Sequence, residues 1–122
     1  MNVEVERHPE YAILRIREPY LNFTVGPELR SLIQEITSEG MYSLILDMAD
    51  VNSTDSSGLS AFVAANRICQ ENGGLMLLLN AGKQIERLID LARLADVLRT
   101  ETDLETAKAR ILKHRAANST NS

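Results

Sequence analysis

The residues best suited to chemistry lie together in residues 47–58, which read Asp-Met-Ala-Asp-Val-Asn-Ser-Thr-Asp-Ser-Ser-Gly. This stretch is dense in carboxylates and hydroxyls, and Ser56 and Ser57 directly follow Asp55. A serine hydroxyl can accept a phosphoryl group, which adds about −1.5 to −2 charges at neutral pH. At the start of a helix, free backbone N–H groups and the positive end of the helix dipole stabilise such a charge. The pattern therefore predicts a serine that can carry a phosphoryl group at a helix start.

The same residues also suit a purely structural role. Asp, Ser and Thr are the preferred residues at the N-caps of helices, so Asp55-Ser56-Ser57 is also explained as a cap. The two interpretations are compatible, because one residue can cap the helix while its neighbour is modified. Both stay open at this point.

Active sites of other kinds have little support in the sequence. No Gly-x-Ser-x-Gly elbow surrounds Ser56, and the two histidines, His8 and His114, are interpreted as solvated surface residues. No Gly-x-x-x-x-Gly-Lys-Ser/Thr loop occurs, and one cysteine with two distant histidines makes a poor metal-ligand set. We therefore expect a protein that is not an enzyme and that holds no cofactor and no metal.

Composition limits the class of protein and its partners. A chain of 122 residues that is 44% hydrophobic suits one domain with one core. The net charge of −4 argues against nucleic acid as partner, because the basic cluster near the end of the chain is small. A lone cysteine, Cys69, fits a reducing compartment, and we recognise no signal peptide and no apolar run near the roughly 20 residues of a membrane span. We expect a cytoplasmic protein with no direct membrane insertion.

Apolar periodicity indicates the elements that must position the serine-rich stretch. Period-two alternation or a short unbroken apolar run predicts strands at residues 2–6, 11–17, 43–48 and 75–79, with a short edge element at 97–98. Apolar residues at helical spacing predict helices around residues 29–36, 59–69, 85–91 and 104–112. Thr102 and Glu105 have the form of a capping box, which places Thr102 at the N-cap of the last helix.

Strands that alternate with helices require crossover connections and a mostly parallel sheet, and the opening hairpin adds an antiparallel strand. We predict an α/β single domain with a mixed sheet of four to five strands and helices packed chiefly on one side. Residues 43–48 should form a central strand, because their apolar run has no solvent-facing alternation. The domain should span residues 1–115, and the small, polar residues 116–122 should form a flexible tail.

With these elements in place, the sequence resembles a known family. Asp55-Ser56-Ser57-Gly58-Leu59, after a strand that ends in Ile45-Leu46-Asp47, is similar to the signature of STAS domains, in particular of anti-sigma factor antagonists. The resemblance covers nearly the whole chain and includes the opening hairpin, the Gly73-Gly74 break and residues 85–90. It implies a STAS-like fold.

The resemblance also implies a partner switch. In the family, a serine kinase that is itself an anti-sigma factor phosphorylates the first hydroxyl residue after the aspartate of the motif, here Ser56. The unmodified antagonist binds the kinase, the phosphorylated form does not, and a metal-dependent serine phosphatase restores the free serine. Asp55 would shape the loop, Ser57 would be the neighbouring hydroxyl and the competing acceptor, and Gly58 would permit close approach of the partner backbone.

One stretch departs from the family pattern. Pro19-Tyr20-Leu21-Asn22 stands where Gly-Glu-Leu-Asp or a close variant is usual, so Asn22 replaces an acidic residue. We expect residues 20–24 to lie near the acceptor, which makes Asn22 part of the predicted partner surface. Ser60, Ala64 and Arg67 share another face of the following helix and should also point toward a partner.

Two other roles of STAS domains remain as alternatives. The chain could be a component of a signalling scaffold or the cytosolic accessory subunit of a membrane transporter. A neighbouring serine kinase would favour the antagonist, large STAS-containing neighbours would favour the scaffold, and a permease with an ATPase subunit would favour the transporter.

Overall fold

A mixed five-stranded sheet forms the middle layer of the computed structural model, which describes residues 1–120. Its strands lie in the order β1 (Val3–Arg7), β2 (Ala12–Ile16), β4 (Leu44–Asp47), β6 (Met76–Leu79) and β7 (Arg99–Glu101). Strand β1 pairs with β2 antiparallel, and the other three pairings are parallel. The predicted mixed sheet is confirmed, and β4, which falls within residues 43–48, is its central strand.

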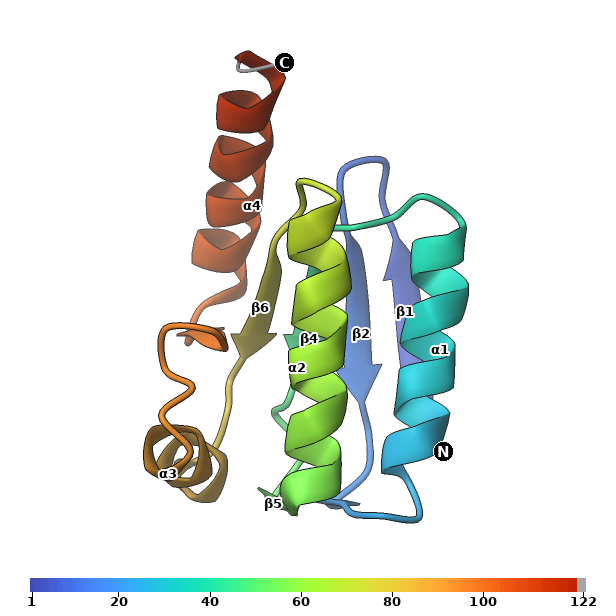
Figure 1. Cartoon of the computed structure of the whole chain (residues 1–122), viewed down its shortest axis with the longest axis vertical. Helices are drawn as coiled ribbons and strands as arrows, with labels where there is room; N and C mark the ends of the chain where they lie inside the picture. Colours follow the sequence, from blue (N-terminus) through green and yellow to red (C-terminus); the bar gives the residue numbers. More distant parts are fainter. Residues whose placement is uncertain (121–122) are drawn as a thin grey trace.

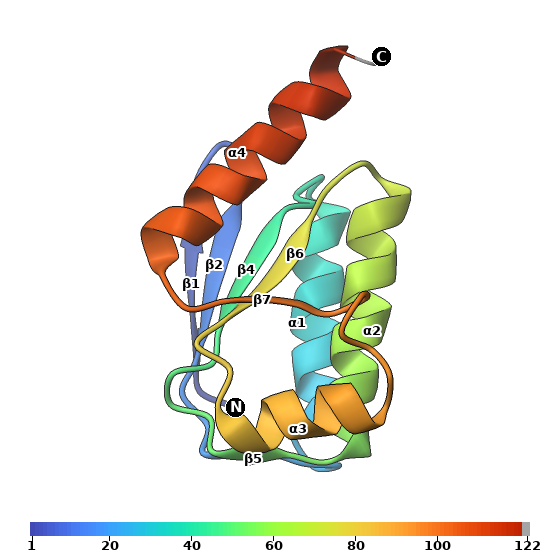
Figure 2. The same ribbon diagram turned by 90° about the vertical axis from the view of Figure 1, so that its left-hand side faces the viewer.

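Four helices cover the sheet: α1 (Gly26–Ser38), α2 (Ser56–Glu71), α3 (Lys83–Leu91) and α4 (Leu104–Thr120). Helices α1 and α2 lie side by side on one face, and α4 crosses the opposite face (Figures 1 and 2). Helix α3 packs against the same core as α1 and α2, through the buried Ile85 and Ile89. Three helices on one face and one on the other match the predicted arrangement.

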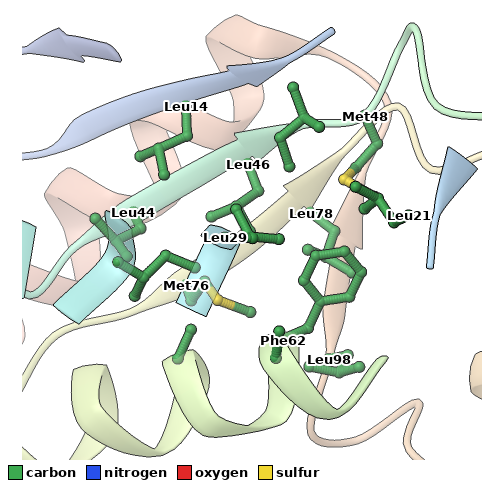
Figure 3. Close-up of a cluster of buried hydrophobic side chains, with 14 of the residues drawn as sticks. Leu14, Leu21, Leu29, Leu44, Leu46, Met48, Phe62, Met76, Leu78 and Leu98 are labelled. Atoms are coloured by element: carbon green, nitrogen blue, oxygen red, sulfur yellow. The ribbon is translucent and has the colours of Figure 1, made fainter. Parts of the chain in front are cut away.

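The larger core lies between the sheet and helices α1 to α3 (Figure 3). Leu14, Leu46 and Leu78 are register partners on three adjacent strands, and none of them is exposed to solvent. Phe62 of α2 and Leu29 of α1 belong to the same buried cluster. Burial at about 25 cal/mol per Å² makes this apolar layer the main source of stability.

A second, smaller core fills the opposite face beneath α4. Ile13, Ile45 and Leu77 are register partners whose side chains point away from the first core, and they cluster with Ala107 and Ile111 of α4. Strand β4 is therefore buried on both faces. This double burial explains why its sequence is an unbroken apolar run without alternation.

The start of α4 differs by one residue from the prediction. The carboxylate of Asp103 accepts hydrogen bonds from the backbone N–H and the hydroxyl of Thr106, both at 2.9 Å, so Asp103 is the capping residue instead of Thr102. These hydrogen bonds hold the pKa of Asp103 below its usual range. The Asp103 carboxylate accepts hydrogen bonds from two donors of Thr106, so the N-cap is Asp103 and not the predicted Thr102. The predicted edge element also shifts, from residues 97–98 to β7.

Helix α4 extends into the segment predicted as a tail. The helix continues through residue 115 to Thr120, so residues 116–120 are helical, and residues 121–122 lie outside the described part of the chain. Ala116 and Ala117 are strong helix formers, and the Asn118 side-chain amide donates to the backbone carbonyl of Gly73. Intrinsic propensity and one long-range contact therefore extend the helix.

The buried thiol of Cys69 gives a test of the packing between α2 and the sheet. Cys69 is fully buried, and this burial raises its pKa to about 12. We expect Ellman's reagent to label the native protein at pH 8 at least about a thousandfold more slowly than the protein in concentrated guanidinium chloride, because the thiolate is the reactive form. Labelling of the native protein at the unfolded rate would contradict the packing of α2.

Candidate functional site

The serine-rich stretch lies at the carboxyl ends of the parallel strands. The chain leaves β4, forms the short strand β5 (Ser53–Thr54) and enters α2 at Ser56. Strand β3 (Tyr20–Leu21) follows β2 and pairs with β5 in a separate two-stranded parallel sheet. Figure 1 shows β5 beside the start of α2 at the lower edge of the molecule. Ligand and partner sites of α/β proteins are commonly built at this edge.

The carboxylate of Asp55 is the junction of this site. Asp55 has an extended backbone and caps α2, with Oδ1 accepting from the backbone N–H groups of Ser57 at 2.9 Å and Gly58 at 3.2 Å. Its other oxygen, Oδ2, accepts from the backbone N–H of Phe23 at 3.1 Å. One carboxylate thus joins the start of α2 to the loop after β3. The capping interpretation of Asp55 is confirmed.

The two serines have different surroundings. Ser56 is the first residue of α2 and is exposed, and within residues 1–120 its hydroxyl makes no hydrogen bond. Ser57 is half-buried, and its hydroxyl packs against Gly26 at the start of α1, where an added Cβ would lie only 2.8 Å from Ser57 Oγ. A macromolecular partner can therefore reach the hydroxyl of Ser56 more freely than that of Ser57.

The loop after β2 lies directly beside the serine-rich stretch, as expected. Tyr20 pairs with Ser53 and Leu21 with Thr54, and the backbone N–H of Asp55 donates to the carbonyl of Leu21 at 3.0 Å. The hydroxyl of Thr54 donates to the same carbonyl at 3.0 Å. The sequence does not indicate β3 and β5, because a two-residue strand is too short to have a detectable period.

Asn22 performs the turn that leads into α1. Its side-chain oxygen accepts from the backbone N–H of Thr24 at 3.0 Å, and its carbonyl accepts from Val25 at 3.0 Å and Gly26 at 2.8 Å. The side chain acts here only as an acceptor, and an amide oxygen fills this role as a carboxylate would. The departure from the family pattern therefore keeps the turn while it removes a negative charge.

Gly58 serves the interior of the chain. It is buried, and an added Cβ would lie 2.0 Å from Thr54 Oγ1 and 3.2 Å from the backbone oxygen of Leu21. The chain's own β3 and β5 approach Gly58 closely, and the approach of a partner backbone stays a prediction. A glycine here allows α2 to start against these two strands.

Gln84 of α3 also contributes to the site, although the sequence does not indicate it. Its side-chain oxygen accepts from the backbone N–H of Thr54 at 3.1 Å, and its amide donates to the carbonyl of Thr54 at 3.3 Å. The amide thus binds β5 on the side away from β3, as a neighbouring strand would. No sequence signal marks this contact, which joins residues thirty positions apart.

The outer face of α2 agrees only partly with the prediction. Ser60 and Arg67 are exposed, whereas Ala64 is half-buried. Arg30 of α1 donates to the hydroxyl of Ser60 at 3.3 Å. A shallow groove of about 350 Å³ lies between the starts of the two helices, lined by Gly26, Pro27, Arg30, Ser31, Ser57 and Ser60.

Comparison with known proteins now identifies the family. A family model described as the STAS domain matches residues 2–107. The chain belongs to the STAS domain family. An anti-sigma-B factor antagonist of Staphylococcus epidermidis is 26% identical to this STAS protein over 105 residues, which are 86% of this chain and 96% of that protein.

Solved structures support the same fold. An anti-sigma factor antagonist from Mycobacterium paratuberculosis superposes with a TM-score of 0.79 at 19% identity, over 90% of this chain and 92% of that one. The Bacillus cell fate determinant SpoIIAA in its phosphorylated form superposes with a TM-score of 0.70 at 18% identity, over 88% and 98% of the two chains. In the described part of this STAS protein, no helix is long and apolar enough to span a membrane.

Removal of the Asp55 carboxylate tests its role as the junction. Asp55→Ala leaves three backbone N–H groups without their acceptor, and we expect it to lower the free energy of unfolding by about 1–2 kcal/mol. Asp55→Asn keeps one acceptor oxygen and should lose less. Urea unfolding measures both, with Asp90→Ala on the exposed face of α3 as the control. A loss below about 0.5 kcal/mol for Asp55→Ala would contradict this role.

A methyl group at Gly58 tests the close approach of α2 to β3 and β5. Gly58→Ala must displace the Thr54 hydroxyl or the Leu21 backbone, so we expect a loss of about 1–3 kcal/mol in unfolding free energy. In the matched control Gly82→Ala, the added Cβ would meet only the Val51 carbonyl, at 3.9 Å, and stability should stay within about 1 kcal/mol of wild type. Equal stability of the two variants would refute the close approach.

Proposed function

We propose that this STAS protein is an anti-sigma factor antagonist whose partner choice is controlled by phosphorylation of Ser56. The unmodified form binds an anti-sigma factor serine kinase, and the phosphorylated form does not. A metal-dependent serine phosphatase removes the phosphoryl group and restores binding. In this proposal the chain is a cytoplasmic substrate and binding partner of enzymes and is not an enzyme itself.

The single observation that carries the proposal is the position of Ser56. It directly follows the capping Asp55, it is exposed, and its hydroxyl is free of hydrogen bonds within the described residues. The relatives named as anti-sigma-B factor antagonists support the choice of partner. Asn22, Asp55 and Ser57 belong to the proposed partner surface, and Gly58 supports that surface from inside.

The proposed modification is an ordinary phosphoryl transfer. The Ser56 oxygen attacks the γ-phosphorus of ATP, the bond to the β-phosphate oxygen breaks, ADP leaves, and a base of the kinase takes the serine proton. Hydrolysis by the phosphatase returns the proton to Ser56 Oγ and releases inorganic phosphate. The roles of this chain are to present the hydroxyl and to hold the product charge.

Phosphorylation of Ser56 should change the stability of the fold far less than it changes the affinity for the kinase. At the start of α2 the helix dipole stabilises an exposed negative charge by about 0.3–1 kcal/mol. In a closed interface the same dianion has to be desolvated without a partner, which costs about 3–4 kcal/mol. This cost weakens binding by roughly two to three decades. The switch therefore acts on the complex and leaves the antagonist folded.

Serine substitutions test the switch. The purified protein is incubated with ATP and candidate anti-sigma serine kinases of the same genome, and the modified residue is mapped by mass spectrometry. We expect Ser56→Ala to accept no phosphate and to bind the kinase persistently, while Ser56→Asp binds weakly. Ser57→Ala is the matched control and should be phosphorylated.

Two outcomes would change this proposal. Full phosphorylation of Ser56→Ala would move the acceptor to Ser57. If no candidate kinase phosphorylated either serine, the antagonist function would be rejected.

A further inference from the structure

The loop beside the acceptor exposes two aromatic side chains in a protein that has few. The chain contains three tyrosines, two phenylalanines and no tryptophan. Tyr11 and Phe62 are buried and Tyr42 is half-buried, whereas Tyr20 is 59% exposed and Phe23 is 74% exposed. The two aromatic residues that the fold does not need for its core thus stand three positions apart.

The backbone beneath these two rings is fixed to the acceptor stretch. Tyr20 pairs with Ser53 in the β3–β5 ladder, and the backbone N–H of Phe23 donates to the Asp55 carboxylate at 3.1 Å. Between them, the Leu21 side chain is fully buried in the larger core. The exposed rings therefore project from an ordered backbone that the start of α2 shares.

We propose that Phe23, together with Tyr20 three positions before it, is the apolar anchor by which the anti-sigma serine kinase binds this protein. This inference rests on the proposed function and adds the residue that supplies affinity. Any protein surface that reaches the Ser56 hydroxyl must also approach Phe23, because Asp55 ties the Phe23 backbone to the first turn of α2. The occupant of this surface is thus the kinase itself.

The absence of charge around Phe23 and its ordered backbone indicate what kind of surface the kinase should have. Residues 19–25 contain no charged side chain, so the matching surface is an apolar pocket instead of an acidic or basic patch. Aromatic side chains on an ordered backbone have only two torsions to fix in the complex, and such residues dominate the affinity of many interfaces. Phe23 is the more exposed of the two rings and should contribute more.

The same anchor strengthens the phosphorylation switch. An apolar pocket closed over Phe23 excludes water from its surroundings, and the Ser56 hydroxyl lies next to this region through the Asp55 junction. A dianion on Ser56 then loses its hydration without gaining a cationic partner. The contribution of Phe23 to kinase affinity and the sensitivity of binding to Ser56 phosphorylation therefore both result from one interface that excludes water.

Truncation of the anchor gives the first test, with the kinase that phosphorylates the wild-type chain as the probe. We expect Phe23→Ala to raise the dissociation constant of the unphosphorylated complex by about 10- to 100-fold. Phe23→Leu retains an apolar side chain and should lose less than Phe23→Ala. Leu112→Ala on α4 removes another exposed apolar side chain, 46% exposed, and should stay within about twofold of wild type.

A label at the same position gives a test that does not depend on affinity. Because the chain has no tryptophan, Phe23→Trp with 5-fluorotryptophan places a single fluorine label at the proposed anchor, and Leu112→Trp is its control. We expect the resonance at position 23, but not at 112, to shift when the kinase is added. Phosphorylation of Ser56 should abolish the shift.

The results separate the two proposals. Kinase binding by Phe23→Ala at the wild-type affinity, or an unchanged resonance at position 23, would overturn the anchor while Ser56 phosphorylation of the wild type still supported the switch. If no kinase phosphorylated the wild-type protein, the proposed function would fail and the anchor would fail with it.

Discussion

The Asp55 carboxylate accepts hydrogen bonds from three backbone N–H groups in two parts of the chain, and the geometry of the site depends on these bonds. Two of these hydrogen bonds start α2 and the third holds the loop after β3. Without them, the first turn of α2 that carries Ser56 would fray, and Phe23 would lose its connection to α2. The exposed hydroxyl of Ser56 is thus presented on an ordered surface.

The buried sheet supports this junction from below. Strand β4 is covered on both faces, so its direction is fixed and its carboxyl end delivers residues 48–55 to one edge. Strand β2 runs parallel to it and delivers β3 to the same edge. Gly58 has no side chain, so α2 can start directly against β5. Gln84 binds β5 through hydrogen bonds to the Thr54 backbone. The core therefore determines where the site lies, and a few polar contacts determine how β5 and the start of α2 are positioned within it.

Much of this architecture could be predicted from local sequence patterns. The apolar runs around Leu46 and Leu78 predicted buried strands, and Asp55 before a helical pattern predicted an N-cap. That Ser56 accepts a phosphoryl group stays a prediction. The pairing of β3 with β5 and the contact of Gln84 with Thr54 could not be predicted, since each joins residues about thirty positions apart and has no period. The close packing of Gly58 against Leu21 of β3 could not be predicted for the same reason. At the C-terminal end, Asp103 replaced Thr102 as the cap, and helix propensity carried α4 past the predicted boundary.

Amide hydrogen exchange at Phe23, Ser57 and Gly58 is the most direct test of the central claim, that a charge is added to a surface that is already built. The exchange rates are measured by NMR in the unphosphorylated protein and again after phosphorylation of Ser56. We expect all three amides to be protected in both forms, because the Asp55 carboxylate accepts their hydrogen bonds before and after modification. Loss of protection at these amides on phosphorylation would contradict it, since the switch would then act by breaking the junction instead of by presenting charge to the partner.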